Sequence, residues 1–112
     1  LGQWMKRGDL VAVAAKGHYS GKPRPALVLQ SNLFSALGSV TICLLTTEFL
    51  DAPLFRLAVE PSPKNGLKQP SQIMIDKIVT VPHDAIGARI GSLDHEAMAR
   101  VDRSLAVFLG IV

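Results

Sequence analysis

The sequence is poor in the features that mark disulfide-rich, zinc-binding and membrane-spanning proteins. It has a single cysteine, Cys43, which cannot pair within its own chain and lies in the apolar stretch VTICLL. No set of cysteine and histidine residues has the spacing of a zinc site. No apolar run approaches the ~20 residues that a membrane-spanning helix requires. These absences favour a buried, reduced thiol and a cytoplasmic protein without a membrane association.

Signals for secretion and for disorder are missing as well. The first residues, LGQWMKRGD, lack the basic start, long apolar run and small-residue cleavage site of a secretory signal. Hydrophobic residues make up 48% of the 112 residues, which is too many for a disordered chain. We therefore expect one folded domain spanning residues 1–112, long enough for a modest core.

Several catalytic motifs are absent. The sequence contains no HExxH, no EF-hand loop and no GxSxG nucleophile elbow. The stretch GHYSGKP faintly echoes a phosphate-binding loop, but no serine or threonine follows Lys22. Metal-dependent hydrolysis and nucleotide binding are therefore disfavoured, and we expect neither a metal nor a cofactor.

The charge balance is mildly basic. Twelve Lys and Arg residues against nine Asp and Glu residues give a net charge of +3 and a pI near 9.4. Such an excess permits a polyanionic partner without requiring one. Five of the positive residues lie within the first 24: Lys6, Arg7, Lys16, Lys22 and Arg24.

Short apolar or alternating runs predict a sheet, and one longer periodic run predicts a helix. The predicted strands cover 8–15, 26–31, 40–46, 54–60 and 72–81, the last with a break after Asp76. Residues 32–39 are expected to hold a helical turn ended by Gly38, and 82–91 a turn plus a short element. A helix is expected after Asp94 as N-cap, ending at Gly110, with one apolar face made of Met98, Val101, Leu105 and Phe108.

These elements predict an α+β fold that is mainly β. The runs 26–31 and 40–46 are apolar at nearly every position, so both faces of these strands must be covered. One face can fill a small barrel, and the other needs the helix or a second copy of the chain. A small curled antiparallel sheet with a C-terminal helix, forming a dimer, fits best.

Arg24 is the first candidate for chemistry. Pro23 and Pro25 restrict the backbone on either side of it, and a predicted strand follows at once. A guanidinium held in this way suits a phosphate and can stabilise its charge during transfer. A surface arginine paired with a carboxylate is the alternative.

Five further candidates lie in loops, at a strand end or within a strand. His18 can exchange a proton near neutral pH, and its neighbour Tyr19 can stack on a base, although both also suit a plain loop. Thr46 and Thr47 can donate to a phosphate, or simply cap a turn. Asp76 interrupts an apolar strand and needs a partner, which could be an arginine or a lysine in a purely structural pair.

Taken together, five stretches resemble the MazF/PemK (Kid) family of toxin endoribonucleases from bacterial toxin–antitoxin systems. These are MKRGDLVAVA, GKPRPALVLQS, VTICLLTT, QPSQIMIDKIVTV and IGSLDHEAMARVDRSLAVFLG. The central signature is R-P-x-L-V, which is weak alone and much stronger with the other four in the same order. The likeness spans nearly the whole chain.

The resemblance implies a small SH3-like barrel with a C-terminal helix, a homodimer, and cleavage of single-stranded mRNA without a metal. In that reaction the ribose 2′-hydroxyl attacks the adjacent phosphorus, leaving a 2′,3′-cyclic phosphate and a free 5′-hydroxyl. A cognate antitoxin would neutralise the toxin with a disordered, acidic segment.

The resemblance also assigns roles to residues. Arg24 matches the arginine that stabilises the phosphate, Thr46 the threonine that helps to hold it, and His18 a supporting histidine. Asp76 matches the general base proposed for the PemK/Kid branch. Met74 departs from the pattern, since that branch has an arginine there as proposed general acid; Arg24 or His18 would then supply the proton, or the chain cuts slowly.

Contacts with RNA are expected outside these four positions too. Base recognition is expected in loops 47–53 and 61–71, and the residues expected to bind RNA are Lys16, Tyr19, Lys22, Thr47 and Gln72.

Two other functions remain open at this level. Gyrase-poisoning toxins of the CcdB type share the barrel and act by binding a protein, without catalysis. The chain could also be an SH3-like binding module that Met74 has left without cleavage activity. An RNase needs Arg24, Thr46 and His18, whereas a gyrase binder works through the end of its C-terminal helix.

Overall fold

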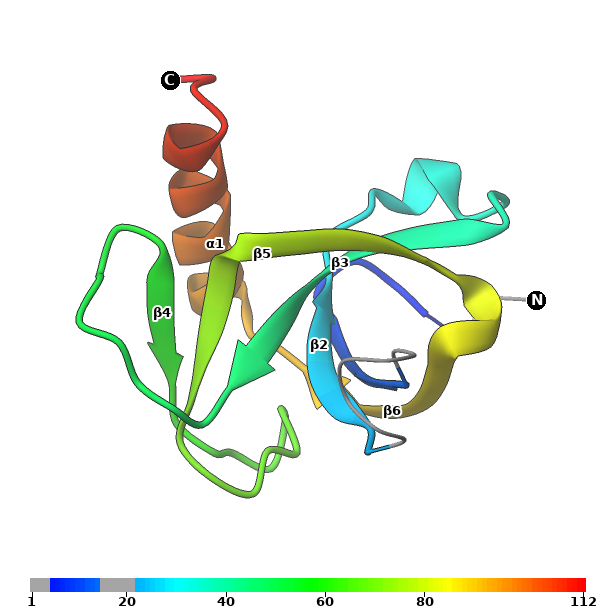
Figure 1. Ribbon diagram of the computed structural model, residues 1–112, viewed down its shortest axis with the longest axis horizontal. Coiled ribbons are helices and arrows are strands. Elements are labelled where there is room, and N and C mark those ends of the chain that lie inside the picture. The colour runs from blue at the N-terminus through cyan, green and yellow to red at the C-terminus, as the bar shows by residue number, and fades with distance from the viewer. Residues whose placement is uncertain (1–4, 15–21) are drawn as a thin grey trace.

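A computed structural model describes residues 5–14 and 22–112 (Figure 1). Over these residues the chain forms a six-stranded sheet, two short 3-10 turns and one helix. The elements are β1 (Asp9–Val13), β2 (Arg24–Val28), η1 (Asn32–Phe34), β3 (Ser39–Thr46), β4 (Arg56–Val59), β5 (Ser71–Pro82), η2 (His83–Ala85), β6 (Ile86–Ser92) and α1 (His95–Phe108). This confirms the predicted α+β class.

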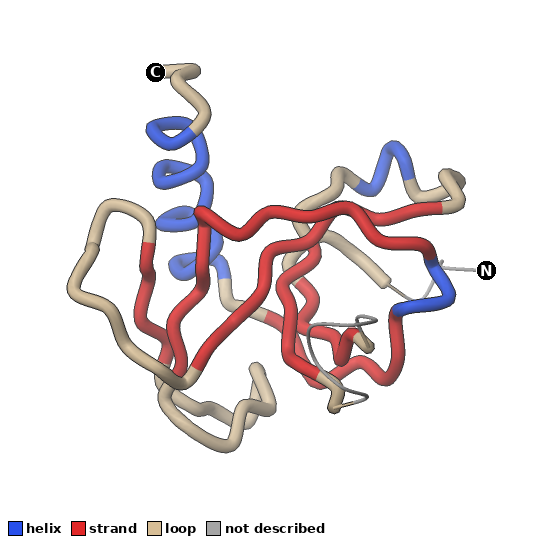
Figure 2. Tube along the Cα trace, in the orientation of Figure 1, coloured by secondary structure: helices blue, strands red, loops and turns tan. Residues whose placement is uncertain are grey.

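The strands lie in the order β4-β5-β3-β2-β1-β6, and every neighbouring pair is antiparallel. The sheet curls strongly without closing, and α1 stands beside β4 and the first half of β5 (Figure 2). None of the described helices is long and apolar enough to cross a membrane.

Both faces of the central strands are covered within one chain. One buried cluster packs beneath α1 and includes Leu27, Leu45, Ile73 and Val101. The other fills the inside of the curl, on the opposite face of the same strands, with Ala26, Val28, Ile42 and Leu44. The doubly apolar strands are thus explained by two cores, because side chains alternate between the faces of a strand.

Cys43 belongs to the cluster beneath α1 and is fully buried. Burial, with a smaller contribution from the charge of Asp76, raises the pKa of its thiol to about 12. The predicted buried thiol is confirmed.

An irregularity in β5 shapes the face of the sheet. A step of two residues on β3, from Leu45 to Cys43, corresponds to a step of five on β5, from Ile73 to Ile78. The extra residues form a bulge, which bends a strand and changes the direction of its side chains. The break predicted after Asp76 lies in this bulge.

Three differences from the sequence prediction stand out. β2 begins at Arg24 because Pro25 is accommodated within the strand, opposite Ala12. Residues 86–92, predicted only as a short element, form the edge strand β6. The turn η1 ends at Phe34, well before Gly38.

The helix follows its prediction at both ends. The Asp94 side chain accepts a hydrogen bond from the Ala97 N–H at 2.8 Å, and Gly110 takes a φ of +73° just after the last turn. Met98, Val101 and Leu105 pack into the core, but Phe108 is 48% exposed. The apolar face therefore extends beyond the surface that one chain covers.

Candidate active site

Arg24 and Thr46 lie on neighbouring strands and line the same open pocket. Arg24 is the first residue of β2, and Thr46 is the last residue of β3. The pocket has a volume of about 360 Å³, and its lining also includes Lys22, Thr47 and Ser71. Two of the predicted catalytic residues are thus brought together, with two of the predicted RNA-binding residues, Lys22 and Thr47, beside them.

The register of the sheet explains why these side chains meet. Ala26 pairs with Leu44 across β2 and β3, and both side chains enter the core inside the curl. Arg24 lies two residues before Ala26, and Thr46 lies two residues after Leu44. In an antiparallel pair these two positions are therefore opposite each other and on the same face. Arg24 is exposed there, so its charge stays in contact with solvent.

The hydroxyl of Thr46 also organises the loop that follows. Its oxygen accepts a hydrogen bond from the Glu48 N–H at 3.0 Å. A hydroxyl that accepts in this way still has its own proton to donate. Thr46 can therefore cap the turn and offer a donor to the pocket at the same time, while Thr47 is exposed at the rim.

Three predicted residues, Lys16, His18 and Tyr19, lie outside the described residues.

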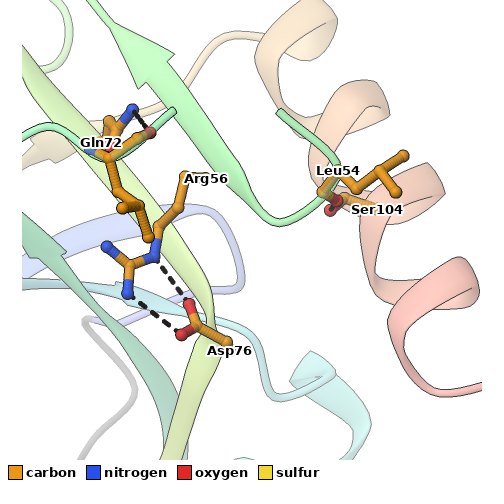
Figure 3. A network of polar contacts seen from close by, with 6 residues as sticks. Leu54, Arg56, Gln72, Asp76 and Ser104 are labelled. Carbon is orange, nitrogen blue, oxygen red and sulfur yellow. Dashed lines mark hydrogen bonds and ion pairs between the residues drawn. The ribbon is translucent and has the colours of Figure 1, made fainter. Parts of the chain in front are cut away.

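Asp76 forms a forked ion pair with Arg56 of β4 (Figure 3). The Arg56 Nε donates to Oδ1 of Asp76 at 2.8 Å, and Nη2 donates to Oδ2 at 3.0 Å. These hydrogen bonds from the guanidinium hold the pKa of Asp76 below its ordinary value, and they raise the pKa of Arg56. The partner that Asp76 needs is therefore found on β4.

Sequence reasoning missed Arg56. In the register of β4 with β5, Arg56 lies directly opposite Met74, the position where the PemK/Kid branch carries an arginine. The available signal was the alternation in LFRLAVE, which already placed Arg56 on the polar face of its strand. The position of that strand beside Asp76 could not be derived from the alternation.

Gln72 holds the loop that follows β3. Its side-chain amide donates to the Leu50 carbonyl and accepts from the Leu50 N–H, both at 3.0 Å (Figure 3). The residue is buried, and its side chain makes the two hydrogen bonds to Leu50 that a neighbouring backbone would otherwise make. Its predicted contact with RNA is a different role from the one seen here.

A second pocket lies on the other side of this loop. It has a volume of about 580 Å³ and is lined by loop residues 49–53 together with Arg56, Gln72 and Arg100. Two arginines, Asp51 and an exposed Phe49 line this pocket, so it offers both charged and apolar groups. Loop 47–53 therefore lines both pockets.

Among residues 5–14 and 22–112, no group of three or more His, Cys, Asp or Glu side chains is placed to hold a metal ion.

Comparison with known proteins finds relatives along nearly the whole chain. The chain is 50% identical over 107 residues to a protein named probable endoribonuclease MazF from Mycolicibacterium smegmatis, covering 96% of this chain and 98% of that one. It is 27% identical over 112 residues to endoribonuclease EndoA from Bacillus subtilis, covering 96% and 97%.

Solved structures share the fold. The Mycobacterium tuberculosis toxin MazF-mt6 superposes with a TM-score of 0.77 at 23% identity, covering 91% of this chain and 96% of that one. A mycobacterial endoribonuclease solved in complex with its cognate antitoxin also gives a TM-score of 0.77 at 23% identity, covering 96% of each chain. The CcdB-type alternative is not favoured by any of these relatives.

The family profile described as PemK-like, MazF-like toxin of type II toxin–antitoxin system matches residues 6–109, nearly the whole chain. The resemblance seen in the sequence is thus confirmed, and the chain belongs to the PemK-like, MazF-like toxin family.

Proposed function

We propose that this chain is a metal-independent, sequence-specific endoribonuclease toxin that cleaves single-stranded RNA. Membership of the toxin family and the two relatives named as endoribonucleases support the enzyme class. The observation in this molecule that carries the proposal is the pocket shared by Arg24 and Thr46. A fixed cation beside a hydroxyl donor suits the phosphate of an RNA strand.

The proposed reaction is an internal displacement at phosphorus. A bond forms between the ribose 2′-oxygen and the adjacent phosphorus, and the bond from that phosphorus to the 5′-oxygen of the next nucleotide breaks. The 2′-hydroxyl proton passes to a base, and an acid gives a proton to the departing 5′-oxygen. The products are a 2′,3′-cyclic phosphate and a 5′-hydroxyl.

Each step has a candidate residue. The guanidinium of Arg24 neutralises the charge that develops on the phosphorane, and the Thr46 hydroxyl donates to one of its oxygens. Asp76 is the proposed base, and Arg24 or His18 the proposed acid.

The RNA strand would be held by residues around this pocket. Lys16 and Lys22 would contact phosphates, Tyr19 would stack on a base, and Thr47 would donate from the pocket rim. Gln72 would contribute to RNA binding only if its amide left the backbone of Leu50. Loops 47–53 and 61–71 would select the sequence.

An antitoxin is the second proposed partner. The family description names a toxin of a toxin–antitoxin system, and a net charge of +3 suits a disordered acidic segment as well as RNA. Because mRNA is the proposed substrate, we place the protein in the cytoplasm.

We propose a homodimer on the basis of an exposed apolar surface. Large apolar side chains are exposed at the end of α1 and in the loop before β4, and the Ser104 hydroxyl joins the two segments by donating to the Leu54 carbonyl at 2.6 Å (Figure 3). We call this the terminal apolar surface: Phe49, Leu50, Leu54, Val107, Phe108, Leu109, Ile111 and Val112. Large apolar side chains exposed on two joined segments are typical of an interface.

The test is cleavage of a long single-stranded RNA by purified protein in EDTA, with the ends of the fragments mapped. Discrete cuts ending in cyclic phosphate are expected. Arg24→Ala should lower the rate by about a hundredfold or more, because one positioned donor to a developing charge is worth that much. Arg103→Ala, an exposed arginine on α1, is the matched control and should cut normally.

Circular dichroism should show that Arg24→Ala is folded, since the side chain is exposed. A normal cleavage rate in Arg24→Ala would show that Arg24 does not stabilise the phosphorane. Intact RNA together with inhibition of DNA gyrase would replace the proposed function by the CcdB-type one.

A further inference from the structure

We propose that Arg56 is a positioning residue for RNA cleavage: from β4 its guanidinium holds the Asp76 carboxylate and supplies the arginine that position 74 of β5 lacks. The inference rests on the proposed function and adds a residue to that site. It explains how a chain with Met74 can retain an arginine next to its proposed base.

The geometry of the pair is that of a carboxylate held in one orientation. Two parallel hydrogen bonds of 2.8 and 3.0 Å join the planar guanidinium to both oxygens of Asp76. A forked pair of this kind fixes the plane of the carboxylate as well as its position. The side chains are only 11% and 21% exposed, so solvent competes weakly for these bonds.

The register places this pair on the same face of the sheet as the pocket of Arg24. Arg56 pairs with Met74, Gln72 pairs with Thr46, and positions two apart on a strand share a face. Across β4, β5, β3 and β2, one face therefore presents Arg56, Met74, Thr46 and Arg24.

The bulge in β5 explains why Asp76 needs to be held. The register shift between Ile73 and Ile78 takes Asp76 out of the regular ladder with β3. A side chain on a bulge is redirected, and without a partner it keeps its rotational freedom. Arg56 removes that freedom from the neighbouring strand β4.

The same contact keeps the carboxylate ionised. Within the described residues, the charged and titratable groups that interact with Asp76 are Arg56 on β4, Lys77 on its own strand and the Cys43 thiol on β3. The thiol stays protonated because its pKa is about 12, so Arg56 is the main source of the lowered pKa of Asp76. Loss of Arg56 should therefore raise the pKa of Asp76 toward or above its ordinary value.

The first experiment is a double-mutant cycle measured by single-turnover cleavage of a defined RNA in EDTA. Arg56→Gln should lower the rate at saturating protein by about ten- to a hundredfold, less than the 10²–10⁴ that a general base contributes. If Arg56 acts through Asp76, the double variant Arg56→Gln/Asp76→Asn should be no slower than Asp76→Asn alone. Arg103→Gln is the control, since Arg103 is exposed on α1 and lines neither pocket, and it should cut at the wild-type rate.

The second experiment returns the arginine to β5. The variant Arg56→Met/Met74→Arg exchanges two directly opposed side chains, so the guanidinium stays near Asp76. It should recover most of the rate that Arg56→Met loses, and it keeps the proposal testable if Arg56→Gln folds poorly. In Arg56→Gln the acidic limb of the pH–rate profile should move to higher pH, which a purely structural role would not cause.

Three results would overturn the proposal: a normal rate in Arg56→Gln, rate losses of Arg56→Gln and Asp76→Asn that multiply, or no recovery in a folded exchange variant. A wild-type protein that leaves RNA intact would instead contradict the proposed function itself.

Discussion

The ion pair with Arg56 determines both the charge and the orientation of the Asp76 carboxylate. A carboxylate in an apolar strand is costly unless it is paired, and Arg56 pairs it through both oxygens. The pair leaves Asp76 charged near neutral pH, as its proposed role of base requires, while making it a weaker base than a free carboxylate. Arg56 also holds the carboxylate in one orientation, and this fixed orientation offsets the weaker basicity.

This pair should make stability depend on pH. Because the pKa of Asp76 is lower in the folded than in the unfolded chain, the pair stabilises the fold above the unfolded pKa, ordinarily about 4. That stabilisation is lost as the pH falls through the folded pKa. Between pH 7 and pH 2, the free energy of unfolding of the wild type should fall by about 1–3 kcal/mol more than that of Asp76→Asn.

Urea unfolding followed by circular dichroism measures this difference. Asp84→Asn, which changes an exposed carboxylate in η2, is the control and should keep the wild-type pH dependence. An equal loss of stability in wild type and Asp76→Asn would show that the pair does not contribute.

At the scale of elements, the loop between β3 and β4 is held from three sides. Thr46 caps its first turn, Gln72 holds Leu50 by two hydrogen bonds, and Ser104 of α1 holds Leu54. The loop also lines both pockets. Its conformation therefore shapes both of them.

Removal of the central tether should loosen this loop. In Gln72→Ala the Leu50 N–H loses its hydrogen-bond acceptor, so we expect its hydrogen exchange to become at least about tenfold faster, the equivalent of losing ~1.4 kcal/mol of protection. Exchange measured by mass spectrometry or NMR checks this. Gln69→Ala, at an exposed glutamine just before β5, should leave Leu50 unchanged. Unchanged exchange of Leu50 in Gln72→Ala would mean that the loop is ordered by other contacts.

Strand positions were predictable where the side-chain pattern was simple. The apolar runs that became β1 and β3 and the capped helix α1 followed from β-branched residues, alternation and end signals. The start of β2 was missed because a proline usually ends a strand, whereas Pro25 is tolerated near the first residue of β2. The glycines of IGARIGS hid β6, an edge strand that is only partly buried.

On the scale of the whole molecule, the terminal apolar surface is the apolar region that one chain leaves exposed to water. Phe108 continues the apolar face of α1 beyond the core, and Leu54, 72% exposed, is joined to the helix through Ser104. Apolar surface gathered on two adjoining segments is stabilised when a partner removes it from water.

A charge placed in this surface should therefore disfavour the proposed dimer. Phe108→Asp should shift the protein to a monomer at concentrations where the wild type is dimeric, because a buried unpaired charge costs several kcal/mol. Light scattering coupled to size exclusion gives the mass directly. Asp84→Asn, a change remote from α1 in the sequence, should stay dimeric; a dimeric Phe108→Asp would place the interface elsewhere.

The sequence by itself determined the local features and the family. Alternation, caps and apolar runs act over a few residues, so they predicted most strands, the helix, the buried thiol of Cys43 and Arg24 at a strand end. Only the tertiary structure decided which residues meet. Arg24 shares a pocket with Thr46, and Asp76 pairs with Arg56, because strand order, register and the bulge in β5 are set by packing between distant segments and not by the neighbours of each residue.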